Sequence, residues 1–204
     1  MVPLKQERAI FLSAGVPDPS KPHFMGDADA AAISAVVSAL LFVALGRRPI
    51  VWGGHPAITP MVWAYAEGLN VDYGQWVTLY QSAFFQEDFP EENARFKNVI
   101  VTEAVDGDQQ ASLANMRQLM ITQNSFEAAI FAGGMRGVYQ EWELFSSQQP
   151  EAKIIPIGST GGAAERLAAD LKAPVEFTSN LDYVSLLFDN LSIDPGEPRG
   201  TVKK

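Results

Sequence analysis

Apolar residues along the chain gather in short runs that end in small residues, and most runs precede a longer stretch with helical spacing. The four clearest runs are residues 9–15 (AIFLSAG), 49–54 (PIVWGG), 128–134 (AAIFAGG) and 153–162 (KIIPIGSTGG). Residues 76–82 (WVTLYQS) and 98–103 (NVIVTE) predict two further strands. Strands that alternate with helices are typical of βαβ units in a parallel sheet. The runs are apolar along much of their length, which indicates strands covered on both faces. The pattern therefore predicts an α/β fold.

Capping residues and glycines indicate where the intervening helices begin and end. The first helix is expected to start near Gly26 to Asp29, where an aspartate can cap it, and to end at Gly46. Pro56 is expected in the first turn of the second helix, because the fixed φ of proline suits that position. Asp108 is a candidate cap for a later helix. The other helical stretches expected from spacing are residues 108–123, 135–147 and 163–172.

The length of 204 residues predicts one large domain, with no internal repeat. We expect a single domain over residues 1–190 and a C-terminal tail over residues 191–204. The stretch 192–204 (SIDPGEPRGTVKK) contains proline, glycine and charge but little apolar content. It is therefore expected to form a loose end or an arm against a partner chain.

Charge and cysteine content narrow the classes of partner. The formal net charge is -9, which disfavours nucleic-acid binding because such binding needs clustered Lys and Arg. A nucleotide ligand stays possible, since helix N-termini and loop amides bind phosphate without side-chain charge. The absence of cysteine fits a reducing cytosol, so a cytoplasmic protein is expected. The most apolar stretch, residues 33–45, is too short to span a bilayer, and no membrane partner is expected.

Small residues end most of the predicted strands, where ligands of open α/β sheets bind. A glycine lets the backbone approach a ligand closely, although one such turn can serve packing alone. Several glycine-rich ends at one edge favour a ligand pocket. The clusters are Ser13-Ala14-Gly15, Gly53-Gly54-His55, Gln81-Ser82, Gly133-Gly134 and Ser159-Thr160-Gly161-Gly162.

Polar residues near these strand ends are candidates for chemistry. Lys21 and His23, in a long proline-rich loop, could contact phosphate or ribose or could simply be solvated. His55 could touch a ligand, act as an acid or base, or cap a helix. Glu103 ends a predicted strand at the same edge. The two histidines lack zinc-ligand spacing, so no metal site is expected.

Two glutamates follow the glycine loop in the stretch AAIFAGGMRGVYQEWELF. Glu141 and Glu143 lie two positions apart, so at most one of them can face the pocket, and Glu141 is nearer the loop. Acidic residues early in a helix can also serve only to complement the helix dipole. The segment GGMRGV lacks the G-x-G-x-x-G pattern, and neither a P-loop nor a G-x-S-x-G elbow is present. A standard NAD dehydrogenase is therefore disfavoured.

The stretches IFLSAG, VWGGHPAIT, FAGGMRGVYQEWELF and PIGSTGGAA, in this order, resemble the SLOG superfamily. That superfamily includes lonely-guy phosphoribohydrolases, DNA-processing proteins and TIR-associated nucleotide-sensing domains. The resemblance covers about residues 8 to 175. It implies a Rossmann-like, doubly wound and mainly parallel sheet with helices on both faces. It also implies a nucleotide bound across the strand ends.

The resemblance to the phosphoribohydrolase branch is incomplete at the site. That branch carries P-G-G-x-G-T-x-x-E, whereas this chain has AGGMRGVYQE, with an extra residue before Gly137 and valine in place of threonine. Glu141 still falls at the acid position. The branch also has a catalytic arginine in a P-R-x-x-x-R-K helix, for which this chain offers only Arg117, in NMRQLM.

Three functions follow from these observations. The first is a domain that binds a nucleotide derivative, such as an ADP-ribose-type signal in bacterial signalling or defence, with a homo-oligomer and a separate effector protein as expected partners. The second is a nucleotide N-glycosidase that uses Glu141, with Arg117 or Arg136 holding phosphate. The third is a purely structural or interaction protein. For the first, the residues expected to contact the ligand are Ser13, Ala14, Gly15, Gly53, Gly54, His55, Thr59, Gln81, Ser82, Glu103, Gly133, Gly134, Met135, Arg136, Gly137, Ser159, Thr160 and Gly161.

Overall fold

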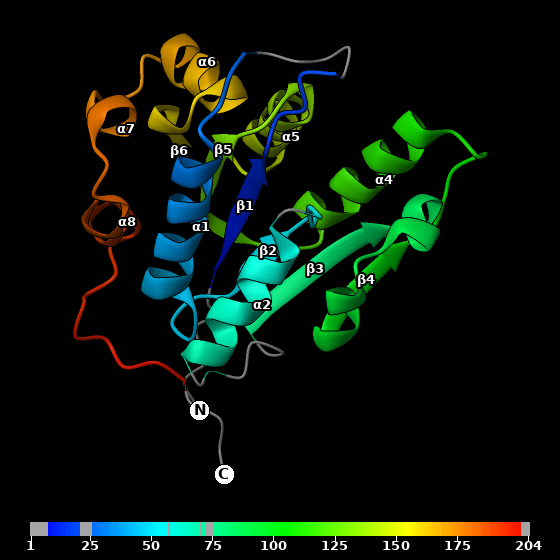
Figure 1. The fold of residues 1–204 in the computed structure, drawn as a ribbon, viewed down its shortest axis with the longest axis horizontal. Coiled ribbons are helices and arrows are strands. Elements are labelled where there is room, and N and C mark those ends of the chain that lie inside the picture. Colours follow the sequence, from blue (N-terminus) through cyan, green and yellow to red (C-terminus); the bar gives the residue numbers. More distant parts are fainter. Residues whose placement is uncertain (1–7, 21–25, 57, 70, 72–75, 201–204) are drawn as a thin grey trace.

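In the computed structural model, which describes residues 8–20, 26–56, 58–69, 71 and 76–200, the strands form one parallel sheet (Figure 1). Its order is β4-β3-β2-β1-β5-β6 across the described residues. The chain moves outward from β1 to β4 and then returns to place β5 on the other side of β1. The bounds are β1 (Ala9–Gly15), β2 (Ile50–Trp52), β3 (Val77–Ser82), β4 (Asn98–Thr102), β5 (Phe126–Gly133) and β6 (Lys153–Ile157). The predicted Rossmann-like α/β fold is confirmed.

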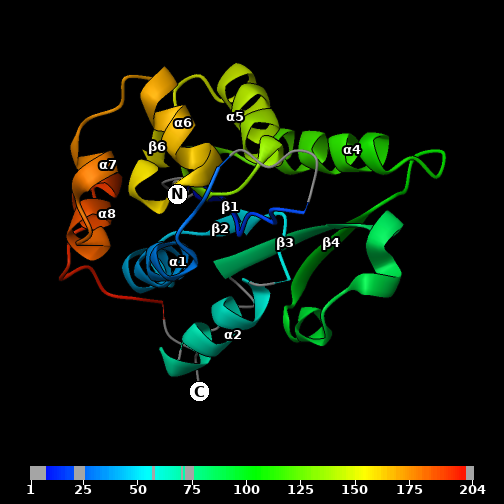
Figure 2. The same cartoon turned by 45° about the horizontal axis from the view of Figure 1, so that its top comes forward.

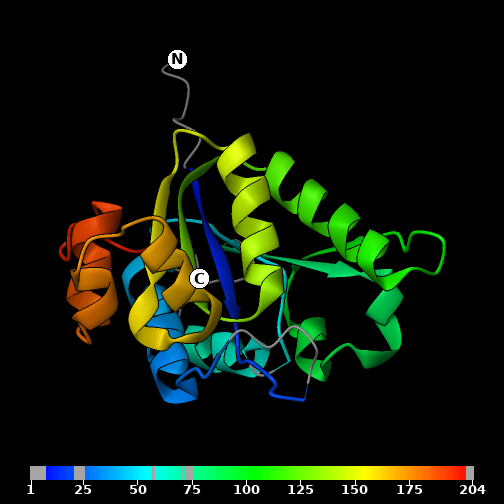
Figure 3. The same cartoon turned by 90° about the horizontal axis from the view of Figure 1, so that it is seen from above.

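Helices cover both faces of the sheet, as Figure 3 shows from above. Helices α1, α2 and α8 pack on one face, and α4 and α5 pack on the other, beside α6. The bounds are α1 (Ala30–Ala44), α2 (Thr59–Gly68), α4 (Gln109–Thr122), α5 (Arg136–Gln148), α6 (Gly162–Asp170), α7 (Glu176–Ser179) and α8 (Tyr183–Leu191), with short 3-10 turns η1 (Ala83–Asp88), η2 (Glu91–Arg95) and η3 (Gly158–Thr160).

The central strands are buried on both sides, which explains their nearly continuous apolar sequence. In β1, Ile10 and Leu12 join the cluster under α1, while Phe11 joins the cluster on the opposite face. The ring of Phe11 stacks on Phe145 of α5 with a centroid distance of 5.3 Å. Burying one such side chain contributes about 1.5–3 kcal/mol to the free energy of unfolding. The core therefore fixes β1 and β5 as the rigid centre of the sheet.

Aspartate caps begin two of the helices, as the sequence predicts. Asp29 Oδ1 accepts from the amides of Ala31 and Ala32 at the start of α1. Asp108 Oδ1 accepts from the Ala111 amide at 2.7 Å at the start of α4. Each cap of this kind stabilises a helix by about 1 kcal/mol. These caps also fix where the two helices begin at the edge formed by the carboxyl ends of the strands.

The start of α2 differs from the expectation for Pro56. The helix begins at Thr59 and has Pro60, not Pro56, in its first turn. The carbonyl of His55 accepts from the amides of Ile58 and Thr59, which closes a turn ahead of the helix. The expectation was wrong because Pro60 satisfies the same φ preference one turn later. His55 thus holds the helix entry through its carbonyl.

The tail also differs from expectation over residues 192–200, which pack on their own chain (Figure 2). The buried guanidinium of Arg47 donates to the carbonyls of Pro195 and Glu197. The amide of Gly200 donates to the carbonyl of Gly46 at 2.7 Å. The prediction of a loose end or a partner arm was wrong for these residues, because Nε and Nη2 of Arg47 find their acceptors in the tail, while Nη1 donates to the Val43 carbonyl of α1. Helices α7 and α8 precede the tail and were not expected from spacing.

Candidate functional site

A cavity of about 220 Å³ opens at the carboxyl ends of β1 and β5. The two strands end in register, with Gly15 opposite Gly133, and the Gly134 amide donates to the Gly15 carbonyl at 2.7 Å. The order in which strands are added to the sheet reverses between β1 and β5, and ligands of open α/β sheets bind at such switch points. The cavity is lined by Leu12, Ser13, Ala14, Gly15, Val16, Trp52, Gly53, Gly54, His55, Leu113, Met116, Arg117, Gly134, Met135, Gly137, Val138 and Glu141. We call it the polar cavity.

Three side chains from three elements meet in the polar cavity. Ser13 Oγ, from β1, donates to Glu141 Oε2 at 2.5 Å. Arg117 Nε, from α4, donates to Glu141 Oε1 at 3.1 Å, and its Nη1 donates to Gln140 Oε1 at 3.1 Å. The Arg117 and Glu141 side chains are only 13% and 16% exposed. The carboxylate is therefore held from both sides, with fixed orientation.

Helix geometry explains why Glu141 reaches the cavity and Glu143 does not. Glu141 lies in the second turn of α5, beyond the reach of a simple dipole effect, and Glu143 is exposed. Gly137 leaves room for the arginine, since a Cβ there would lie 2.9 Å from Arg117 Nη2. Across the described residues, Nη2 has no hydrogen-bond acceptor. The Nη2 edge of the guanidinium, which lies beside Gly137 in the cavity lining, can therefore donate to a further acceptor.

The glycine turn after β5 is held by its own hydrogen bonds. The Gly133 amide donates to Thr160 Oγ1 at 2.8 Å, and the Gly134 amide donates to the Gly15 carbonyl. The amides of Met135, Arg136 and Gly137 find no acceptor within the described part of the chain. The sequence suggests phosphate on the amides of residues 133–137 or 53–55, and within the first of these stretches an anion is better placed on the amides at the start of α5 than on Gly133 and Gly134.

A second cavity, of about 260 Å³, adjoins the first and is mainly apolar. Phe85, Phe89 and Pro90 form one wall, and Gly53 to His55 separate it from the polar cavity. We call it the apolar cavity. Its other lining residues are Pro56, Thr59, Gln81, Ser82, Asp88, Leu113 and Met116.

Two polar side chains of the apolar cavity, Gln81 and Thr59, already have partners within the chain. Gln81 Nε2 donates to the Gly53 carbonyl at 2.8 Å, and its Oε1 accepts from Asn93 at 3.3 Å. Thr59 Oγ1 donates to the His55 carbonyl at 3.0 Å. Gly54 has φ +71, and a Cβ there would collide with the Gln81 side chain. Gln81 therefore braces the turn after β2, and the cavity offers mainly flat apolar surface.

His55 lines both cavities and stands between them. Its ring lies against Gly15, where a Cβ would be 3.5 Å from the ring. Burial lowers the pKa of His55 below its ordinary value, so the imidazole is neutral at pH 7. A neutral imidazole can donate from one nitrogen and accept at the other.

Several residues expected at the site lie outside both cavity linings. Glu103 and Arg136 are exposed. Thr160 is buried, where its hydroxyl donates to the Ile157 carbonyl, and Ser159 contacts the Tyr183 hydroxyl at 3.1 Å. Gly161 turns the chain, with its amide donating to Gly158. Gly133 also lies behind the lining. Lys21 and His23 lie outside the described residues. Ligand contacts of this group stay predictions.

Other lining residues were missed by the sequence analysis. Leu113, Met116 and Val138 lie on helices with ordinary core spacing, and nothing in the sequence separates them from core positions. Phe85 and Phe89 lie in and after a 3-10 turn that periodicity does not reveal. Their contribution to the site depends entirely on tertiary packing.

The described ranges contain neither a cluster of metal ligands nor a membrane-spanning helix. No group of three or more His, Cys, Asp or Glu residues there could hold a metal ion. None of the helices described has both the length and the apolar content needed to cross a membrane.

Comparison with known proteins places the chain in a family. No match is found among curated proteins. The SLOG cluster3 family matches residues 23–191, which include α1, the glycine turn after β5, and all of α5. That span also contains Arg117, His55 and Glu141. The matched stretch is most of the chain, and the protein belongs to the SLOG cluster3 family.

Proposed function

We propose that this protein binds a nucleotide-derived ligand across the two adjoining cavities. The charged and hydroxylated part of the ligand would lie in the polar cavity, and the base would lie in the apolar cavity. The observation that carries the proposal is that Arg117 Nη2 and the neighbouring amides at the start of α5 all lack an acceptor within the described residues. Family membership supports the coarser statement that this is a nucleotide-related domain.

The polar cavity suits a phosphate or a ribose. Arg117 Nη2 and the amides of Arg136 and Gly137 provide donors of positive character, and the dipole of α5 adds to them. Glu141 can accept from ribose hydroxyls, because Ser13 and Arg117 already fix its orientation. A ligand with phosphate and free hydroxyls uses both kinds of group.

The apolar cavity suits a flat ring. Phe85, Phe89, Leu113 and Met116 provide apolar surface, and rings stack favourably on such walls. His55 lies where the ribose would join the two parts of the ligand. ADP-ribose has a base, two riboses and a diphosphate, and it matches this division better than a free base or an inorganic phosphate.

A second candidate function is cleavage of an N-glycosidic bond. The contact of Ser13 and Arg117 with Glu141 favours it, since a fixed carboxylate can hold a water molecule. With AMP as the substrate of that reaction, the C1′–N bond breaks and its electron pair leaves with adenine. The water oxygen bonds to C1′, and the water proton passes through Glu141 to the leaving nitrogen. The helix carrying Arg117 lacks the arginine-rich motif of the phosphoribohydrolase branch.

Calorimetry and product analysis on the same samples test both functions. The ligands are ribose 5-phosphate, AMP, NAD and ADP-ribose, with inorganic phosphate as the control. The binding proposal expects ADP-ribose to bind most tightly, and saturation at 100 times the dissociation constant to stabilise the protein by about 2.7 kcal/mol. Absence of any heat or thermal shift with all four ligands would contradict it.

Chromatography of the same incubations separates binding from turnover. Release of free base by the wild type, lost in Glu141→Gln, would establish the glycosidase and overturn a purely binding role. Tight binding with no product at high protein concentration would exclude the glycosidase for these ligands. Glu143→Gln is the matched control, because Glu143 lies on the same helix but is exposed.

A further inference from the structure

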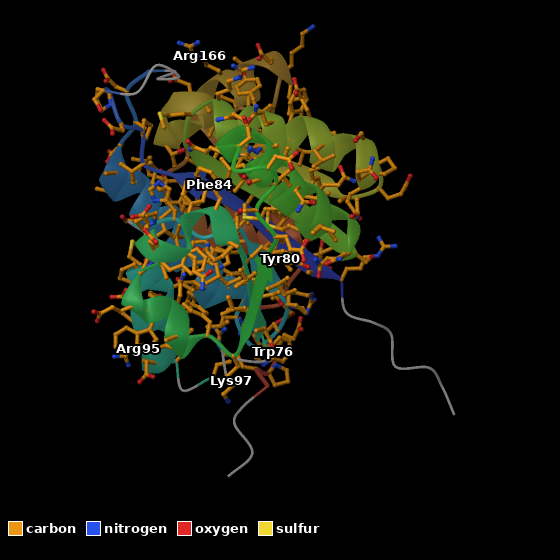
Figure 4. The ribbon with its side chains drawn as sticks, turned by 90° about the vertical axis from the view of Figure 1, so that its right-hand side faces the viewer. Trp76, Tyr80, Phe84, Arg95, Lys97 and Arg166 are labelled. Carbon is orange, nitrogen blue, oxygen red and sulfur yellow. The ribbon has the colours of Figure 1, made fainter. Side chains whose placement is uncertain are left out.

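The outer strand β4 is an open edge with exposed apolar side chains. It pairs with β3 on one side, and along its other side no backbone partner exists among the residues described. Ile100 is 38% exposed and Val101 is 50% exposed. Figure 4 faces this edge, with Lys97 labelled at its beginning. Exposed apolar edge strands are templates for pairing with another strand.

The sequence of this edge is complementary to itself when read in the opposite direction. Residues 97–103 are Lys-Asn-Val-Ile-Val-Thr-Glu. With Ile100 at the centre, valine falls opposite valine and asparagine opposite threonine. Lysine falls opposite glutamate at both ends. Moving the centre by one residue in either direction removes this match.

We propose that two copies of the chain associate through β4 in antiparallel register, with Ile100 at a two-fold axis. Lys97 of one subunit then lies opposite Glu103 of the partner subunit, and the two-fold repeats this pair at the other end. A two-fold interface uses the same patch on both subunits, so the patch has to be self-complementary. Opposite charges facing across an antiparallel pair stabilise the register.

The neighbouring helix is compatible with this arrangement. Helix α4 packs over β3 and β4. An axis perpendicular to the sheet at Ile100 brings the two α4 helices to the same face of the joined sheet. Arg117 is the only charged residue of α4, and it is engaged with Glu141 in the polar cavity. In a chain of net charge -9, a helix whose single charged residue is paired with Glu141 avoids like-charge repulsion between copies.

Sedimentation velocity of the full chain over a dilution series tests the proposal. The wild type is expected to dimerise reversibly. Ile100→Lys places two like charges at the axis and should weaken the dimer roughly tenfold or more. Val175→Lys is the matched control, since Val175 is 73% exposed and lies beside α7, away from this edge. A wild type that stays monomeric at every concentration, or an Ile100→Lys protein that dimerises like the wild type, overturns the proposal.

Charge reversal tests the register. Lys97→Glu and Glu103→Lys should each weaken the dimer roughly threefold to thirtyfold, because each creates two like-charge pairs. The double variant restores opposite charges and should recover wild-type association. Failure of the double variant to recover overturns the antiparallel register. Circular dichroism checks that each variant is folded, and hydrogen exchange of residues 97–103 should slow as wild-type concentration rises.

Discussion

The polar and apolar cavities share one edge of the sheet and one wall, yet they differ in almost every chemical respect. The polar cavity holds a carboxylate fixed by Ser13 and Arg117, with donors left open. In the apolar cavity, Gln81 and Thr59 are already hydrogen-bonded within the chain, and Phe85 and Phe89 dominate the wall. The difference shows that glycine-rich strand ends leave space for a cavity, whereas side chains from other elements determine whether that cavity is polar or apolar.

The largest effect is expected from Gly133→Ala, which disturbs the turn that carries α5 and the polar cavity. Gly133 has φ +57, and a Cβ would collide with the Gly15 carbonyl and the Ile33 side chain. The free energy of unfolding should fall by about 2–5 kcal/mol, measured by urea denaturation. Gly107→Ala is the control, because Gly107 has φ +69 but open space around it. That variant should lose only about 1–2 kcal/mol, and equal losses would refute steric crowding at Gly133.

The next largest effect is a loss of affinity that is specific to ligands with phosphate. Arg117→Gln should weaken binding of ribose 5-phosphate and ADP-ribose roughly tenfold to a hundredfold, because a charged donor is removed. Adenosine, which lacks phosphate, should change much less. Calorimetry measures both. Arg136→Gln is the comparison variant, since Arg136 is exposed at the start of α5. If Arg136→Gln matched the loss of Arg117→Gln, phosphate would lie outside the polar cavity.

A smaller loss of affinity, with the opposite dependence on the ligand, is expected in the apolar cavity. Phe89→Ala should weaken binding of adenosine and ADP-ribose roughly threefold to tenfold, because stacking surface is lost. Ribose 5-phosphate has no base and should bind as before. Titration calorimetry with these three ligands is the measurement. Equal loss for ribose 5-phosphate would mean that the two cavities do not divide the ligand.

The smallest effect is the pH dependence of stability that comes from His55, in the wall shared by the two cavities. Burial lowers the pKa of His55 below its ordinary value of 6.5, so the unfolded chain binds this proton more readily than the folded one. The free energy of unfolding should therefore fall as the pH drops below about 6.5, with a slope of at most about 1.4 kcal/mol per pH unit from this group. His55→Gln should flatten that part of the curve. An unchanged slope would show that His55 is not the responsible group.

The sequence predicted the sheet well because each strand carries its own signal. Buried strands such as β1 are apolar throughout, and the caps Asp29 and Asp108 mark their helices. The small residues after β1, β2 and β5 also lie at the edge of the sheet where both cavities open. These are local features, which depend on few residues along the chain.

The chemistry of the site depended on contacts between distant segments and could not be predicted in the same way. Ser13 and Glu141 are 128 positions apart, and Arg117 approaches Glu141 only after α4 and α5 pack together. Hydrogen bonding of the Gly133 amide to Thr160 is equally invisible in the sequence. Which backbone amides remain available to a ligand depends on the hydrogen bonds that other segments make with the turn. Those contacts form only in the tertiary structure.

The docked tail has a consequence for protein engineering. The amide of Ile10 donates to the Pro49 carbonyl, and the amide of Gly200 donates to the Gly46 carbonyl. The start of β1 and the end of the docked tail are thus both held by one short loop, at the edge of the sheet opposite the cavities. A circular permutant that joins these two points by a flexible linker should keep the fold. Its new ends could open beside Gly107, so that a reporter would sit at the edge of the sheet where the cavities lie.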